Sequence, residues 1–209
     1  MLAVAAAVGN GQVLLTWDEP IQRSVESNRT PLLNAVFRTL SFLGSTVVVV
    51  TLGLVTAALS WRRCRAVALA VAIATCARPL LEFGLKASVD RTRPDFERLV
   101  AGNGPSFPSG HVMAAIALWG LLPVVVALYT RRRAVWWAAA ALAGTLIAGI
   151  SASRIYLGVH WFSDVTGGLI VGAFLLLAID TLLHKAHDRH PCRLGRIHRH
   201  EPALTASPG

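Results

Sequence analysis

Charged residues are scarce in this chain, since Asp, Glu, Lys and Arg make up only 15% of its 209 residues. Soluble globular domains carry about 25% of these residue types, so the composition argues against an ordinary soluble domain. Apolar residues make up 54% of the chain, and its mean hydropathy is +0.55. Low charge combined with positive hydropathy is typical of an integral membrane protein.

Acidic residues are the rarer charge type, because 11 Asp and Glu stand against 20 Lys and Arg and leave a net charge of +9. A basic surplus can indicate nucleic-acid binding, but the sequence has neither an aromatic platform nor a known motif to support it. The basic residues gather instead at residues 62–65, at residues 131–133 and after Lys185. We therefore predict no nucleic-acid partner and expect membrane lipids to be the partners of these clusters.

The apolar residues are collected in long stretches. Five of them reach about the 20 residues that a helix needs to cross a hydrocarbon layer of about 30 Å. They cover residues 39–61, 66–85, 112–130, 134–153 and 165–183. The sequence therefore predicts an all-α fold, a polytopic transmembrane helical bundle with five spans.

Residues 2–15 form a further apolar segment, which is short and interrupted by Gly9, Asn10 and Gly11. It lacks the basic start of a signal peptide. We expect a short first helix, and the sequence leaves open whether this helix crosses the membrane. Residues 1–184 then form one transmembrane domain, and residues 185–209 form a basic tail that we expect to be mobile.

The positions of the basic clusters predict the orientation of the chain. If the five spans alternate in direction, all three clusters lie on one side, which the positive-inside rule makes cytoplasmic. The protein is then a multi-pass protein of the plasma (inner) membrane with its tail in the cytoplasm. The loops at residues 86–108 and 154–160 face the outside, or the periplasm.

A helix of a different kind precedes the first span. Thr30 is a natural N-cap, and Pro31 suits the first helical position. Apolar residues recur at helical spacing from Leu32 to Leu40. The pattern favours an amphipathic helix in the outer interface, or else a continuation of the following span.

Three short blocks at the outer ends of the spans carry residues suited to phosphate chemistry. They read Lys86-x6-Arg93-Pro94, then Pro108-Ser109-Gly110-His111, then Ser153-Arg154-x5-His160-x3-Asp164. Lys86, Arg93 and Arg154 supply cations for a phosphate dianion, which arginine can hold bidentately. Ser109 and Gly110 offer a hydroxyl and an accessible amide at the start of a helix, whose positive end favours an anion.

His160 and Asp164 lie four residues apart. On a helix they share one face, so the carboxylate can fix the tautomer of the ring. The other ring nitrogen is then free to attack phosphorus. A lone histidine near a membrane boundary is more often a polar cap, but the convergence of cations, two histidines and an aspartate favours catalysis.

In order, spacing and content, the three blocks resemble the signature of the type 2 phosphatidic acid phosphatase (PAP2) family of integral-membrane lipid phosphatases. The resemblance implies a six-helix core and hydrolysis of a lipid phosphate without a metal or other cofactor. It implies that His160 forms a phosphohistidine, that Asp164 orients it and that His111 is the general acid. It assigns phosphate-binding roles to Lys86, Arg93, Ser109, Gly110 and Arg154.

The lipid itself is left open by the sequence, as is the oligomeric state. Prenyl diphosphates such as undecaprenyl diphosphate and phosphatidylglycerol phosphate rank first, and phosphatidic acid also fits. The same blocks would serve a lipid-linked phosphotransferase. A non-catalytic lipid transporter would use the cations but has no need for the His-x3-Asp pair, and the haloperoxidases that share the constellation are soluble.

Three charged residues in or near the blocks are ambiguous. Arg78 and Glu82 can pair at i,i+4 within a span, or Glu82 can hold a phosphate-binding cation in place. Arg91 lies inside the first block but off its signature positions, and we interpret it as a candidate headgroup contact.

Two further patterns are interpreted structurally. Asp90, Asp95 and Glu97 alternate with arginines and indicate a solvated loop rather than a metal site. Gly168 and Gly172 form a face of small residues, which we expect to pack inside the bundle rather than against another protomer.

Overall fold

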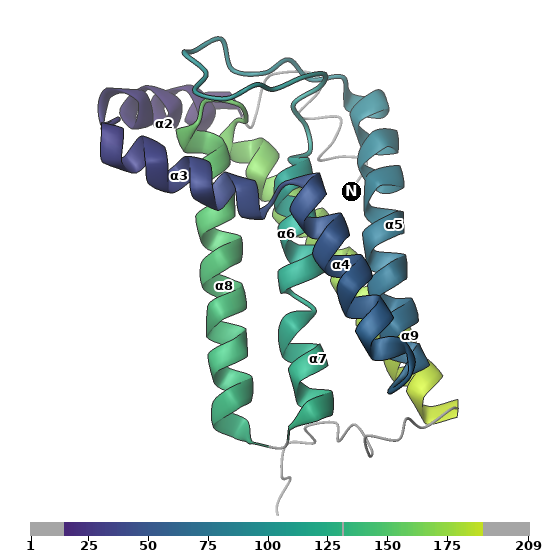
Figure 1. The fold of residues 1–209 in the computed structure, drawn as a ribbon. Helices are drawn as coiled ribbons and strands as arrows, with labels where there is room; N and C mark the ends of the chain where they lie inside the picture. The colour runs from purple at the N-terminus through teal and green to yellow at the C-terminus, as the bar shows by residue number, and fades with distance from the viewer. Residues whose placement is uncertain (1–14, 131, 190–209) are drawn as a thin grey trace, which may run out of the picture.

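A computed structural model describes residues 15–130 and 132–189, and their secondary structure is helical. The helices are α2 (Leu15–Ser27), α3 (Pro31–Leu43), α4 (Thr46–Trp61), α5 (Arg65–Val89), α6 (Gly110–Trp119), α7 (Leu122–Tyr129), α8 (Arg133–Tyr156) and α9 (Phe162–Arg189). Figure 1 shows α5 to α9 running between the two ends of a bundle, with α2 and α3 lying across one end. The predicted all-α transmembrane bundle is confirmed.

Four segments of the described chain are long and apolar enough to cross a membrane, namely Arg65–Val89, Gly110–Ala127, Arg133–Tyr156 and Phe162–Ala186. Helices α3 and α4, bent by 43° at a short break, add a fifth only if the pair is counted as one span. The predicted first span, residues 39–61, is therefore wrong in its start, because α3 continues to Leu43 and Ser45 caps a new helix. The predicted helix at residues 2–15 lies almost wholly outside the described residues.

Helix α3 is the amphipathic helix that the sequence predicts. Thr30 is its N-cap, and the side chain accepts a hydrogen bond from the Leu33 amide. The ring of Phe37 stacks on Tyr156 at the end of α8, with centroids 4.2 Å apart. The Tyr156 hydroxyl donates to Asn34 Oδ1 at 2.8 Å and accepts from the Thr30 amide at 3.1 Å. These contacts fix α3 across the end of α8.

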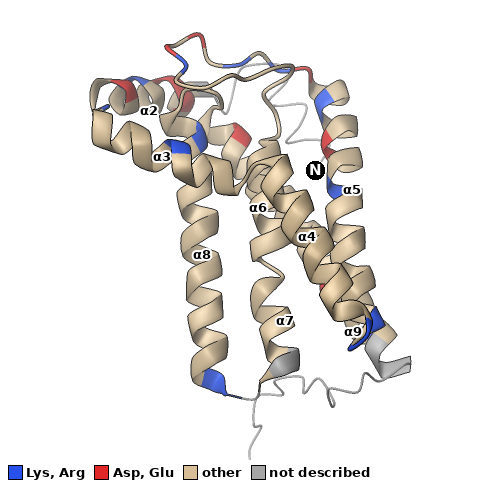
Figure 2. Cartoon of the chain, viewed as in Figure 1, with Lys and Arg blue, Asp and Glu red and all other residues tan. Residues whose placement is uncertain are grey.

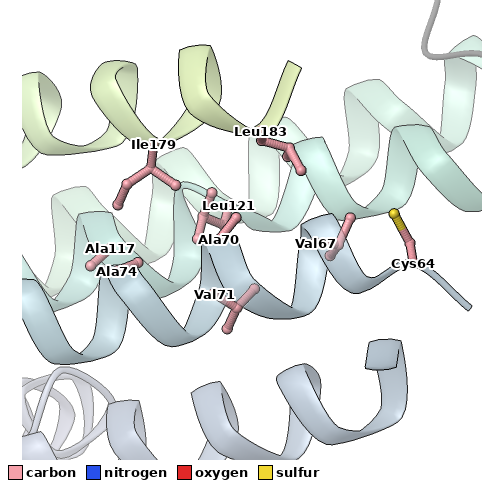
Figure 3. Close-up of a cluster of buried hydrophobic side chains, with 9 residues drawn as sticks. All are labelled: Cys64, Val67, Ala70, Val71, Ala74, Ala117, Leu121, Ile179 and Leu183. Carbon is pink, nitrogen blue, oxygen red and sulfur yellow. The ribbon is translucent and has the colours of Figure 1, made fainter. Parts of the chain in front are cut away.

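The bundle core lies between α5, α6–α7 and α9. Figure 3 shows its largest cluster of buried apolar side chains, which consists of Cys64, Val67, Ala70, Val71, Ala74, Ala117, Leu121, Ile179 and Leu183. A Cβ on Gly172 would lie 2.8 Å from Ile116 Cδ1, and one on Gly168 would lie 2.9 Å from the Ser109 carbonyl oxygen. The prediction that these two glycines pack inside the bundle is confirmed.

The two ends of the bundle differ in their charges. The turn between α4 and α5 and the start of α8 carry basic residues at one end, whereas acidic and basic residues mix in the loops at the other (Figure 2). Helix α9 extends to Arg189, beyond the domain boundary predicted at residue 184. Residues 190–209, the rest of the predicted tail, lie outside the described residues, as does Arg131 of the basic cluster at residues 131–133.

Candidate active site

Backbone hydrogen bonds join the three sequence blocks at the loop-rich end of the bundle. The Ser109 amide, which precedes α6, donates to the Asp164 carbonyl oxygen in α9 at 3.1 Å. The Ser106 amide donates to the Arg91 carbonyl oxygen at 2.7 Å. The loop after α5 therefore lies against the start of α6, and the start of α6 lies against the start of α9.

His160 occupies the turn between α8 and α9, and it is 2% exposed. Its Nδ1 lies 3.6 Å from Asp164 Oδ2, slightly beyond hydrogen-bond length, and its Nε2 lies 3.3 Å from Arg93 Nη1. A guanidinium can only donate, so Nε2 is the acceptor and the ring proton is on Nδ1, facing the carboxylate. These contacts favour the tautomer in which Nε2 is unprotonated and its lone pair faces Arg93.

The protonation state of His160 follows from its burial. Loss of solvent around the ring lowers the pKa of His160 from 6.5 to about 4, although the nearby Asp164 carboxylate opposes this shift. The cations Arg154 and Arg93 lower it further. The imidazole is therefore neutral at pH 7, as a nucleophile must be.

The predicted cations surround this histidine from separate elements. Arg93 donates to the carbonyl oxygens of Asn103, Gly104 and Val159 as well as contacting the ring, so it also braces the loop. Burial lowers the pKa of Arg93 below its usual value. Arg154, 4% exposed, donates from Nη1 to Ser41 Oγ of α3. Its buried Nε finds no hydrogen-bond partner among the described residues.

The third cation, Lys86, belongs to a charged row on α5. Its Nζ lies 2.9 Å from Glu82 Oε1, and Arg78 Nη1 lies 2.5 Å from Glu82 Oε2. Arg78 also donates to the Gly110 carbonyl oxygen at 3.3 Å. Both interpretations of Glu82 therefore hold in the geometry, because it pairs with Arg78 and also holds Lys86.

Gly110 is placed at the start of α6, directly against that carboxylate. A Cβ on Gly110 would lie 2.0 Å from Glu82 Oε1 and 2.3 Å from Glu82 Cδ. Only glycine allows Glu82 to lie so close to the positive end of α6. Ser109 is the N-cap, yet its side chain makes no cap hydrogen bond, and the buried Oγ has no partner among the described residues.

His111 is partly buried in the first turn of α6. The field at its ring comes from Arg154, from His160 and from two cations of α5, Arg78 and Lys86. The structure thus brings His111 within electrostatic reach of all three blocks.

A buried network behind Asp164 was missed by sequence reasoning. It consists of Asp18 of α2, Arg91 and Ser163, all less than 9% exposed. We interpreted Arg91 as a candidate headgroup contact, but its buried guanidinium pairs with Asp18 and Asp164 instead. No periodicity links residues so distant in sequence, although a carboxylate such as Asp18 on a helix beside a membrane segment was a signal for a buried partner.

The acidic residues of the loop after α5 do not join the site. Asp90, Asp95 and Glu97 are exposed, as expected of a solvated loop. Within residues 15–130 and 132–189, no three His, Cys, Asp or Glu side chains are grouped so that they could hold a metal ion. The independence of the reaction from metals stays a prediction.

Comparison with known proteins gives consistent matches. The model of the PAP2 superfamily matches residues 63–188. Phosphatidylglycerophosphatase B of Bacillus subtilis (strain 168) is 30% identical over 189 residues, which are 85% of this chain and 88% of that protein.

Two crystal structures share the fold. The first transmembrane PAP2 type phosphatidylglycerolphosphate phosphatase from Bacillus subtilis matches with a TM-score of 0.75 and 28% identity, covering 92% of this chain and 94% of that chain. LpxE from Aquifex aeolicus matches with a TM-score of 0.63 over 79% of this chain and 95% of that chain. Its identity of 22% supports a likeness of fold alone.

Proposed function

Because the chain belongs to the PAP2 superfamily, we propose that it is a membrane lipid phosphatase that cleaves its substrate through a phosphohistidine at His160. The observation that carries the proposal is the setting of this one side chain. It is a buried, neutral imidazole with a carboxylate at Nδ1 and a guanidinium at Nε2. A phosphate that replaces the contact to Arg93 would meet the lone pair of Nε2 directly.

The first half of the reaction transfers the phosphoryl group to the enzyme. His160 Nε2 attacks phosphorus while the bond from phosphorus to the lipid oxygen breaks. Once the phosphate dianion offsets the nearby cations Arg154, Arg78 and Lys86, His111 carries a proton and donates it to that oxygen. The lipid leaves as an alcohol or, from a diphosphate, as a monophosphate. Asp164 stabilises the positive charge that develops on the His160 ring.

The second half returns the enzyme to its starting state. His111, now neutral, accepts a proton from water as the water oxygen attacks phosphorus. The bond from phosphorus to Nε2 breaks, inorganic phosphate leaves, and His160 is again a neutral acceptor. Both halves use the same groups in opposite roles, as acid–base catalysis requires.

The phosphoryl oxygens require donors throughout. Arg93 contacts His160, Arg154 acts on the same ring electrostatically, and Lys86 acts on His111 from α5. Arg154 Nε and Ser109 Oγ are buried polar groups without partners among the described residues, which suits them to bind an anion. Their unmet hydrogen bonds favour a bound phosphate over an empty site.

The names of the relatives guide the choice of lipid. Phosphatidylglycerophosphatase B and the crystallised phosphatidylglycerolphosphate phosphatase favour phosphatidylglycerol phosphate as the first candidate substrate. A prenyl diphosphate is the second candidate and phosphatidic acid the third. Phosphate release from all three in detergent, measured with and without chelator and vanadate, tests the substrate and the independence from metals together.

The site lies at the end of the bundle opposite the basic turn between α4 and α5 (Figure 2). The positive-inside rule then supports our proposal that the site faces the extracytoplasmic side of the plasma membrane. The lipid phosphate would enter from the outer leaflet.

Replacing His160 with Ala should lower phosphate release at least about 1,000-fold, because no nucleophile remains. The matched control is His184→Ala, since His184 pairs with Asp180 on α9, with Nδ1 3.4 Å from Oδ1. This control should keep wild-type turnover. Substantial residual turnover in His160→Ala would exclude the phosphohistidine mechanism.

Product analysis separates the remaining candidates. A phosphotransferase would pass the phosphoryl group to an added sugar or lipid acceptor instead of releasing it. A transporter would move lipid across liposome membranes without releasing phosphate from any of the three substrates.

A further inference from the structure

Arg91 joins parts of the chain that are far apart in the sequence. Its side chain is 6% exposed, and its Nη1 donates to Asp164 Oδ1 at 2.7 Å and to Ser163 Oγ at 2.6 Å. Its Nη2 donates to Asp18 Oδ2 at 2.7 Å. The planar fork of arginine can hold two carboxylates in fixed directions, which a lysine ammonium cannot do.

Asp18 ties the other end of this contact to the start of α9. Its Oδ1 accepts from the Ser163 amide at 2.9 Å, and its Oδ2 accepts from the Ser163 hydroxyl at 2.5 Å. Asp164 Oδ2 accepts from the Trp161 amide at 2.8 Å. Both oxygens of Asp164 therefore have fixed donors, and the carboxylate cannot turn away from His160.

The charges of the network are not balanced. Asp18 and Asp164 are 1% and 0% exposed, and in the contacts described they share a single guanidinium, Arg91. An unpaired buried charge is costly, so an apolar pair would be the simpler packing solution. The surplus negative charge lies behind a neutral imidazole, where it can stabilise the positive charge that develops on the ring when Nε2 bonds to phosphorus.

We propose that Asp18, Arg91 and Ser163 form a positioning network that sets the orientation and the electrostatic environment of the Asp164–His160 pair. Helix α2, which lies outside the three sequence blocks, thereby takes part in catalysis through Arg91. The inference rests on the proposed function in that it assigns His160 as the nucleophile.

The first test separates geometry from binding. Arg91→Gln should lower kcat roughly 10- to 100-fold, the loss typical when a residue that orients a metal-binding histidine is removed. KM should change little, because Lys86, Arg93 and Arg154 remain. Arg91→Lys keeps the charge but loses the fork, and should lower kcat by less. Arg23→Gln removes an exposed arginine that pairs with Glu19 on α2, and should match the wild type.

The second test uses the sign of the charge change. The groups that face His160 are Asp164, Arg154, Arg93 and His111, and the network acts on the first of them. Arg91→Gln adds to the negative surplus, so the pKa of His160 should rise. The apparent pKa of the acid limb in the pH profile of kcat/KM should rise with it. Asp18→Asn removes the surplus, so both should fall. A purely structural role predicts no such opposite shifts.

The double variant tests whether Asp18 acts through Arg91. Asp18→Asn with Arg91→Gln restores the net charge of the network but not its geometry. In this double variant, the apparent pKa of the acid limb of kcat/KM should return toward the wild-type value. Its kcat should stay as low as in Arg91→Gln. Losses that multiply would show two independent effects and overturn the proposal.

The readouts also separate this inference from the proposed function. The pKa of His160 can be measured by NMR of histidine-labelled protein, with His160→Gln to assign the signal, whether or not any lipid is hydrolysed. An inactive wild type would overturn the proposed function while the NMR shifts still test the network. Wild-type kcat and an unshifted His160 pKa in Arg91→Gln would overturn the network alone. If Arg91→Gln does not fold, the network is tested by the kcat of Arg91→Lys and by the His160 pKa of Asp18→Asn, and wild-type values of both would overturn it.

Discussion

At the scale of single residues, the site depends on close approaches that leave no room for larger side chains. The signature residues could be predicted from the sequence because they stand at the ends of apolar stretches, where a charged side chain is costly unless it is paired or faces a polar site. Arg91 could not be interpreted correctly, because its partner Asp18 is 73 residues away and no local pattern records that contact.

Gly110→Ala tests the contact between α6 and Glu82. The new Cβ would lie 2.0 Å from Glu82 Oε1, so the carboxylate must move and release its hold on Lys86. We expect kcat/KM to fall roughly 10-fold or more, as when a binding charge is misplaced, and the melting temperature to fall as well, because Glu82 also pairs with the buried Arg78. The matched control is Gly84→Ala on α5, where a Cβ meets no described atom within 4 Å. Equal activity in both variants would contradict the assignment.

The pKa of His160 predicts how stability depends on pH. The folded value of about 4 lies below the ordinary 6.5, so the unfolded chain binds the proton first as the pH falls. Stability should therefore be full above pH 6.5 and fall between pH 6.5 and 4, by on the order of 1–2 kcal/mol at pH 5. Thermal unfolding in detergent should show a steeper acid loss for the wild type than for His160→Gln. Equal losses of stability in the two proteins as the pH falls would contradict the assignment of this acid loss to His160.

At the scale of the helices, the apolar run that the sequence predicts as one span is divided between α3 and α4. Hydropathy placed the first span at residues 39–61 because the apolar run does not stop at Gly44 or Ser45. The break arises from capping, since the Ser45 hydroxyl accepts from the Val48 amide and begins α4. Helix α3 is thereby free to lie across α8, where Ser41 receives a hydrogen bond from Arg154.

Tyr156→Phe tests α3 as a support for Arg154. The variant keeps the ring that stacks on Phe37 but loses the hydrogen bonds to Asn34 and Thr30. We expect a loss of about 1–2 kcal/mol in stability and a rise in KM, because Arg154 loses part of its support. Thr39→Val is the control, since that hydroxyl donates within α3 to the Ala35 carbonyl oxygen. An unchanged KM would separate α3 from substrate binding.

At the scale of the whole molecule, the distribution of charge predicts an orientation in the membrane. The basic turn between α4 and α5 and the start of α8 lie at the end opposite the site (Figure 2). A fluorescent protein that matures only in the cytoplasm, fused after Gly209, should be bright. A phosphatase reporter that needs the periplasm, fused at the same place, should be inactive, and its activity would reverse the proposed sidedness.

Neutralising the basic turn tests the cause of that orientation. Replacing Arg62, Arg63 and Arg65 with Gln should give a mixed population in the same reporter assay, because the bias toward one orientation is reduced. An orientation that stays uniform would assign the topology to other segments.

The order of synthesis determines when the buried network can form. Its members come from the first, middle and last described parts of the chain, at Asp18, Arg91 and Asp164. During synthesis from the N-terminus, Asp18 and Arg91 are available to each other long before α9 emerges. His160 and Asp164 follow both of these residues in the chain, so under the proposed mechanism a chain that has not reached α9 lacks its nucleophile and cannot attack the lipids around it.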